Sequence, residues 1–120
     1  MLDRLDRPVR PGDLREDPTV TVTLLYFPGC PNWQTADANL RAALAETGAD
    51  VAVDRRVVDT IEDAERLGFL GSPTVLINGR DPFAEPGAVP GLSCRVYRTQ
   101  DGVTGAPTVD QLRAALLDGS

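Results

Sequence analysis

The segment Thr19–Phe27 reads TVTVTLLYF and leads into Pro28–Trp33, which reads PGCPNW. Valine alternates with threonine in the first segment, and both of its faces become apolar near the end, which predicts a β-strand in the middle of a sheet. The second segment opens with a Pro-Gly corner and predicts a helix over residues 31–47, with Pro31 at the first helical position. Cys30 therefore lies between a central strand and the start of a helix.

The rest of the chain continues the alternation of strands and helices. A strand over residues 51–58 follows the first helix, and this order predicts a right-handed βαβ unit with parallel strands. Asn78-Gly79 predicts a hairpin turn, after which residues 80–92 form a Pro/Gly-rich connection. The remaining predicted elements are a helix over 60–68 capped by Thr60, a strand over 74–78, a short strand over 93–98, and a last helix opened by a capping box of Thr108 and Gln111.

The first residues differ in composition from the rest. Residues 1–18 alternate Arg with Asp or Glu and contain three prolines. Such a segment has little apolar surface to bury, which predicts a flexible N-terminal tail. We therefore expect one α/β domain over residues 19–120.

The composition excludes several classes of function. The 120 residues carry a net charge of −6, which disfavours a nucleic-acid partner. With two cysteines and no histidine there is no Cys–His pair, no Ser-His-Asp triad and no ordinary zinc site, so we expect neither a metal nor a cofactor. No apolar run could cross a bilayer, and the N-terminus has no apolar secretory core. We therefore expect no membrane partner and a cytoplasmic location, where any Cys30–Cys94 disulfide would be transient.

The position of Cys30 has two interpretations. A helix N-terminus carries about half a positive charge and stabilises a thiolate rather than a thiol, which favours a nucleophilic cysteine. Alternatively, Cys30 is an unreactive cysteine buried as a small hydrophobic residue. We prefer the nucleophile, because a structural cysteine gains nothing from a place at the cap of a helix.

A second element supports this preference. Leu70–Ile77 reads LGSPTVLI and places Pro73 at the very start of a strand, where the Ser72–Pro73 peptide bond is a candidate for the cis form. Together with Cys30, this pattern resembles the thioredoxin-like superfamily over roughly residues 19–118. The resemblance implies a central mixed sheet of about four strands flanked by helices, with the third strand antiparallel to the first. It also implies that Ser72, Pro73 and Thr74 form a substrate-binding loop beside the cysteine.

The sequence departs from thioredoxins at one position. Their motif is Cys-x-x-Cys, whereas Trp33 occupies the place of the second cysteine here. Trp33 is either a core residue of the helix or an aromatic wall that shields the thiolate or contacts a substrate. The sequence is similar to the bacterial DF-family (seleno)proteins in its GCPNW corner, in NGRDPF over 78–83 and in SCRVY over 93–97. Relatives that carry selenocysteine at the position of Cys30 imply redox or nucleophilic use of that residue.

The place of Cys94 depends on the connection that precedes it. If residues 80–83 return as a hairpin strand, the Pro/Gly loop brings Cys94 back to the edge near Cys30, where it could resolve a mixed disulfide. If residues 93–98 form the hairpin strand, Cys94 starts that strand at the far end and is structural. Arg80, Asp81 and Arg95 flank the loop and could bind an anionic thiol cofactor, but exposed charges are the default expectation. Arg55 and Arg56 alternate faces in a strand and are expected to be solvated.

The leading hypothesis is a thiol–disulfide oxidoreductase or thiol-dependent reductase with Cys30 as nucleophile. Cys94 or a low-molecular-weight thiol would resolve the intermediate, and the substrate would be a protein or small-molecule thiol or disulfide. One alternative is organomercurial or soft-metal thiolate chemistry with Cys30, Cys94 and either Asp37 or Asp81. Another is a non-enzymatic thioredoxin-fold binding module whose loop at 79–92 holds a partner.

Overall fold

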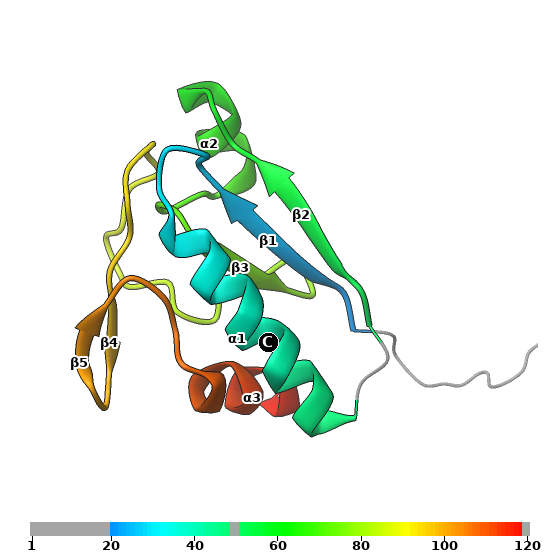
Figure 1. Ribbon diagram of the computed structural model, residues 1–120. Helices are drawn as coiled ribbons and strands as arrows, with labels where there is room; N and C mark the ends of the chain where they lie inside the picture. The colour runs from blue at the N-terminus through cyan, green and yellow to red at the C-terminus, as the bar shows by residue number, and fades with distance from the viewer. Residues whose placement is uncertain (1–19, 49–50, 119–120) are drawn as a thin grey trace, which may run out of the picture.

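In the computed structural model, β1 (Val22–Tyr26) is the middle strand of a three-stranded sheet (Figure 1). β2 (Val53–Val57) pairs with β1 in parallel, and β3 (Thr74–Ile77) pairs with β1 antiparallel, so the sheet is mixed. The central place predicted for the first strand is confirmed. The predicted βαβ unit with parallel strands is also present, with the helix after β1 connecting it to β2.

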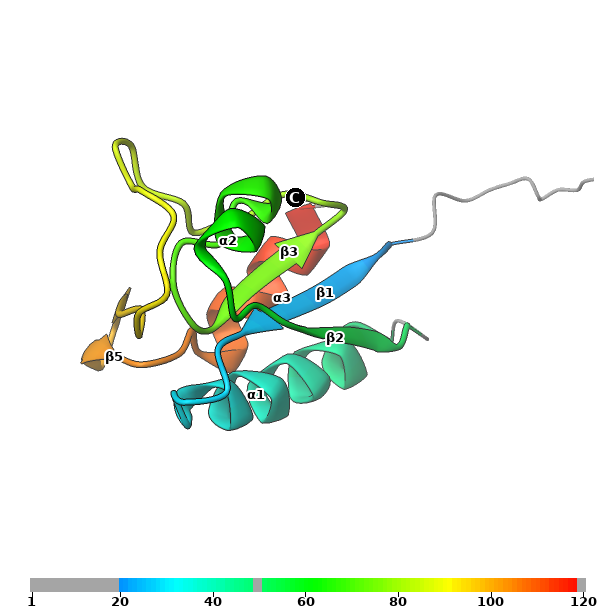
Figure 2. The ribbon, with the colours of Figure 1, turned by 90° about the horizontal axis from the view of Figure 1, so that it is seen from above.

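Helices cover both faces of this sheet (Figure 1, Figure 2). α1 (Asn32–Thr47) and α3 (Val109–Asp118) pack together on one face, and α2 (Ile61–Leu67) lies on the other. Because adjacent residues of a strand point to opposite faces, β1 supplies both cores. The buried members of the larger core, under α1 and α3, are Val22, Leu24, Ala36, Leu40, Ala43, Leu44, Val75, Ile77, Ala106 and Leu112. The smaller core, under α2, is formed by Leu25, Val58, Ala64 and Phe69.

The structure describes residues 20–48 and 51–118, and the tail predicted over residues 1–18 lies outside these ranges. The longest described helix, α1, has 16 residues. Within the two described ranges, no helix combines the length and the apolar composition that a membrane crossing requires.

The helix ends follow the capping residues of the sequence. The Thr60 hydroxyl accepts a hydrogen bond from the backbone N–H of Asp63 at 3.1 Å and opens α2. At α3 the capping box is reciprocal: Thr108 N–H donates to the Gln111 side chain at 3.0 Å, and Gln111 N–H donates to the Thr108 hydroxyl at 3.1 Å. Both predicted caps are confirmed, and each satisfies backbone donors that a helix leaves unpaired.

The sheet has three strands rather than the expected four or so, because pairing beyond β3 ends at the bridge between Ile77 and Arg80. The intervening Asn-Gly turn forms as predicted, with φ of 55° and 78°. Asp81 then accepts a backbone hydrogen bond from two residues further on, at 2.9 Å. Pro82 has no N–H to donate to a ladder. This turn leads the chain away from the edge of β3.

The last two strands form a hairpin apart from the sheet. β4 (Tyr97–Thr99) pairs antiparallel with β5 (Gly102–Thr104), and the hairpin stands beside the sheet in Figure 1. The short strand predicted over residues 93–98 is therefore correct only at its end. The residues before Tyr97 pair with a different part of the chain, and this pairing forms the candidate site.

Candidate functional site

Cys30 lies at the corner between β1 and α1. Its backbone N–H donates to the carbonyl oxygen of Phe27 at 3.0 Å, which closes the Pro-Gly turn predicted here. Pro31 is the N-cap of α1 rather than its first helical residue, so Cys30 stands one position further from the helix than the sequence suggested. The Cys30 residue is 0% exposed. The sulfur is therefore at the predicted corner but has no direct access to solvent.

The 71–74 loop lies against this corner. The Ser72–Pro73 peptide bond is cis, as predicted. The Cys30 thiol donates to the Ser72 carbonyl oxygen with a sulfur–oxygen distance of 3.7 Å, and the Ser72 hydroxyl accepts from the backbone N–H of Phe27 at 3.0 Å. Thr74 is buried and its hydroxyl donates to the carbonyl of Gly71 at 2.7 Å. The loop is thus tied to the Cys30 corner through both the side chain and the backbone of Ser72.

A second segment of the same chain occupies the outer edge of this loop. The N–H of Ser72 donates to the carbonyl of Ser93 at 2.8 Å, and the N–H of Arg95 donates to the carbonyl of Ser72 at 2.9 Å. These two bonds make Ser72 and Cys94 a parallel bridge. The backbone groups that the thioredoxin resemblance would leave for a substrate are therefore paired with residues 93 and 95.

This pairing brings the two cysteines together. Cys94 is exposed, and its bridge with Ser72 places it beside the residue whose carbonyl oxygen accepts the Cys30 thiol. The pKa of Cys94 is raised, first by side-chain hydrogen bonding with Cys30, then by desolvation and by the charge on Cys30. Of the two places predicted for Cys94, the one near Cys30 is therefore correct. The route differs from the prediction, because residues 80–83 do not return as a strand.

Gly71 makes the close approach possible. Its φ is 124°, a conformation that side chains with a Cβ rarely adopt. A Cβ added there would lie 2.9 Å from the Arg95 Cβ and 3.2 Å from the Ser93 carbonyl oxygen. Only glycine therefore lets the 93–95 segment lie directly against the loop.

Arg95 anchors the 93–95 segment on its other side. Its guanidinium donates to Asp81 at 2.7 Å, to the carbonyl of Phe83 at 2.8 Å and to the hydroxyl of Thr74 at 3.3 Å. The side chains of Arg95 and Asp81 are each 9% exposed. The expectation that these charges would be exposed is wrong, because the connection after the Asn-Gly turn folds back over them.

Tyr97 completes the anchor, and in the sequence it stood out only as the last residue of the SCRVY run. The ring is buried, and the Arg95 guanidinium carbon lies 4.6 Å from its centroid. Its hydroxyl donates to the carbonyl of Pro73. Burial is the largest cause that raises the pKa of Tyr97, because it disfavours the phenolate. Tyr97 therefore connects the start of the separate hairpin to the loop beside Cys30.

Trp33 packs rather than stands free. Its ring stacks on that of Tyr26 with centroids 4.4 Å apart, and it lies against the core under α1 and α3. This contact agrees with the packing interpretation of Trp33. Its role as an aromatic wall beside a substrate stays a prediction.

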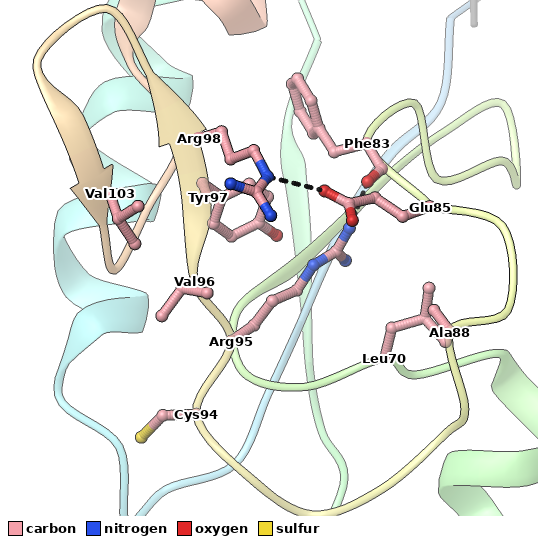
Figure 3. Close-up of a pocket in the computed structure, with 10 residues that line it drawn as sticks. All are labelled: Leu70, Phe83, Glu85, Ala88, Cys94, Arg95, Val96, Tyr97, Arg98 and Val103. Atoms are coloured by element: carbon pink, nitrogen blue, oxygen red, sulfur yellow. Dashed lines mark hydrogen bonds and ion pairs between the residues drawn. The ribbon is translucent and has the colours of Figure 1, made fainter.

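The pocket drawn in Figure 3 has a volume of about 420 Å³ and lies beside Cys94. Cys94 is at one end, with its sulfur turned away from Arg95 and Glu85. Most of the lining is apolar, and Arg98 and Glu85 form an exposed ion pair of 3.8 Å across it. The lining residues are Leu70, Phe83, Glu85, Ala88, Cys94, Arg95, Val96, Tyr97, Arg98 and Val103.

The carboxylates proposed for metal chemistry are both bound by arginines. Asp37 is buried and accepts from Arg55 at 2.8 Å and 3.0 Å and from Arg41 at 3.2 Å. Arg55 is thus a partner of Asp37 rather than only a solvated charge. Asp81 is held by Arg95. Among the residues of 20–48 and 51–118, no three His, Cys, Asp or Glu side chains gather in a way that could hold a metal ion.

Comparisons with protein-family models, with curated proteins and with solved structures found no match to this chain. The geometry of the two thiols and their surroundings is therefore what indicates a function.

Proposed function

We propose that this chain is a thioredoxin-like thiol–disulfide oxidoreductase or thiol-dependent reductase of the cytoplasm, with Cys30 and Cys94 as its redox pair. The observation that carries the proposal is the place of the two cysteines against the same residue, Ser72: the Cys30 thiol donates to its carbonyl oxygen at 3.7 Å, and Cys94 forms a backbone bridge with it. The interaction with Cys30 that raises the pKa of Cys94 agrees with this placement. Two sulfurs in contact can exchange with a substrate disulfide and then close a disulfide between themselves.

The surroundings of the pair support reversible chemistry. The segments that carry the two cysteines both hydrogen-bond to Ser72: the Phe27 N–H and the Cys30 thiol from one segment, and backbone groups of residues 93 and 95 from the other. One sulfur is exposed and can meet a reagent, and the other is buried beside it. A neighbouring thiol also protects a sulfenate from irreversible oxidation, because it condenses to a disulfide. The substrate is a protein or small-molecule disulfide, and an external thiol regenerates the reduced pair.

Metal-thiolate chemistry is the weaker proposal. Two adjacent sulfurs suit a soft metal ion, but the carboxylates that an organomercurial mechanism would require, Asp37 and Asp81, are neutralised by arginines. A binding module without exchange chemistry would leave the placement of both cysteines at Ser72 without a use.

Mild oxidation tests the redox pair. Trypsin cleavage after arginine places Cys30 in the peptide 16–41 and Cys94 in the peptide 81–95. After treatment with diamide, mass spectrometry should find these two peptides joined, and dithiothreitol should separate them. The same protein denatured in urea is the control, because contact between the thiols is then lost. A protein that forms only mixed or intermolecular disulfides under native conditions would contradict the proposal.

A further inference from the structure

If Cys30 attacked the substrate first, Cys30 would have to be the exposed cysteine, but the structure shows the reverse. Cys30 is 0% exposed and lies behind the loop at 71–74 and the segment at 93–95. A disulfide can be attacked only along the line of its S–S bond, so the attacking sulfur must be reachable. Cys94 is the exposed member of the pair.

The covering segment is also firmly held. Both backbone groups of Ser72 are paired with residues 93 and 95. Arg95 adds a buried ion pair with Asp81 and a hydrogen bond to the carbonyl of Phe83. Removing the segment to open Cys30 would leave this guanidinium and carboxylate without their partners, which is costly for buried charges. The geometry therefore favours a substrate that meets Cys94 where it stands.

A pocket is present at that place. Its volume of about 420 Å³ is within the range of small-molecule sites. Val96 and Val103 are 67% and 63% exposed, and both line the pocket next to Cys94. Exposed valines beside a reactive atom favour a substrate with an apolar group to cover them.

We propose that Cys94 is the sulfur that first exchanges with a substrate disulfide, that the pocket beside it takes the apolar arm of that substrate, and that Cys30 resolves the adduct. This inference rests on the proposed function and assigns the order of its steps and the class of its substrate. The substrate is a disulfide, R–S–S–R′, in which R is an apolar group small enough for the pocket.

The steps balance without another reactant until regeneration. The Cys94 thiolate, its proton lost to solvent, attacks the sulfur that carries R, forms Cys94–S–S–R and releases R′–S⁻, which takes up a proton. The Cys30 thiol loses its proton, and its thiolate attacks the Cys94 sulfur, forms the Cys30–Cys94 disulfide and releases R–S⁻, which takes up a proton. The substrate is reduced by two electrons and the protein is oxidised by two. An external dithiol reduces the protein disulfide and becomes a disulfide itself.

Single-cysteine variants test the order. Butyl methanethiosulfonate transfers a butylthio group to a thiol, and the adduct can be placed on peptide 16–41 or 81–95 by mass spectrometry. Under native conditions, we expect the Cys30→Ser protein to be modified on Cys94 at least about tenfold faster than the Cys94→Ser protein on Cys30, because access controls the rate. In urea the two rates should converge. A Cys94→Ser protein that reacts as fast as Cys30→Ser, or faster, would overturn the proposed order.

The apolar arm has its own control. 2-Hydroxyethyl methanethiosulfonate has the same leaving group but a polar arm. The ratio of the butyl rate to the hydroxyethyl rate on Cys94 therefore measures how strongly the pocket prefers an apolar group. Each buried methylene is worth a factor of about four. Val96→Asp should lower this ratio towards its value in urea, and Val89→Asp should not, because Val89 is 78% exposed and lies outside the lining. A ratio in the native wild type equal to that in urea would overturn the substrate class.

The outcomes separate this inference from the proposed function. Suppose that diamide joins the two cysteines in the wild type, but butyl methanethiosulfonate modifies the Cys94→Ser protein faster than the Cys30→Ser protein. The redox pair then stands and only the order of attack is wrong. If diamide never joins them, the redox pair itself fails.

Discussion

Arg95 and Asp81 form an ion pair of 2.7 Å in which both side chains are almost completely removed from solvent. The two residues belong to segments that leave β3 and return to it, and the pair holds them together next to Cys94. The Thr74 hydroxyl and the Phe83 carbonyl bind the same guanidinium. The position of the exposed cysteine thus depends on a buried charge pair formed by the next residue in the chain.

Asp81→Asn should destabilise the protein strongly, because it leaves the Arg95 charge buried without its counter-charge. We expect a loss of about 3–5 kcal/mol in the free energy of unfolding, measured by urea denaturation. The matched control is Asp54→Asn, which breaks the exposed pair of Asp54 with Arg56 at 2.9 Å and should change stability by less than about 1 kcal/mol. Equal effects of the two substitutions would show that the Arg95–Asp81 pair is not an anchor.

Gly71→Ala should separate the two cysteines. The new Cβ would meet Arg95 and Ser93 within 3.2 Å, so the 93–95 segment must move outward. We expect slower formation of the Cys30–Cys94 disulfide by diamide, measured by the joined tryptic peptides. Gly87→Ala is the control, since Gly87 also has a positive φ of 82° but no atom lies within 4 Å of its added Cβ. Similar rates in the two variants would argue against the role of Gly71.

The pH dependence of labelling at Cys94 should show the influence of Cys30 on its pKa. The pKa of Cys94 is raised because its thiol is hydrogen-bonded to Cys30 and lies near the charge of that residue. Iodoacetamide labelling of Cys94 should therefore have its midpoint above the ordinary value of about 8.5. Cys30→Ala removes both causes and should move the midpoint down towards that value. An unchanged midpoint in Cys30→Ala would show that the two thiols do not interact in solution.

Tyr97 should make the free energy of unfolding decrease at alkaline pH. Folding raises the pKa of its phenol above the unfolded value of about 10, because the ring is buried. The resulting contribution to stability is complete below pH ~10, and it is lost as the pH rises from there towards the folded-state pKa, since the unfolded chain loses the proton first. Tyr97→Phe should lack this component when urea denaturation is compared across alkaline pH. The variant should also be less stable at neutral pH by about 1–3 kcal/mol, because the Pro73 carbonyl loses its buried partner.

Local sequence signals predicted the parts of the fold that depend on near neighbours. The alternation in Thr19–Phe27 identified the central strand, and Thr60 and Thr108 identified two helix starts. Each of these depends on hydrogen bonds or periodicity within a few residues. The corner at Cys30 was predicted in the same way, apart from the one-residue shift of the helix start.

The failures depend on contacts between distant segments. The sequence after the Asn-Gly turn was expected to add a strand, but Asp81 and Pro82 end the pairing after one residue. Nothing local shows that Arg95 would be buried, because its partner is on the other side of a Pro/Gly-rich loop. For the same reason the sequence left two places open for Cys94. A signal for Gly71 was present but not used, since glycine is the residue that adopts positive φ most readily in a tight turn.

The backbone bridge between Ser72 and Cys94 also makes the stability of the fold depend on the redox state of the two cysteines. A bond between Cys30 and Cys94 would enclose residues 31–93, which include α1, β2, α2 and β3. Closing a loop of this length lowers the entropy of the unfolded chain and can stabilise the fold by about 4 kcal/mol. The oxidised protein, which has just reduced a substrate, is then more resistant to thermal unfolding and to proteolysis than the reduced protein. The melting temperature of this chain would therefore report the fraction of molecules that contain the disulfide.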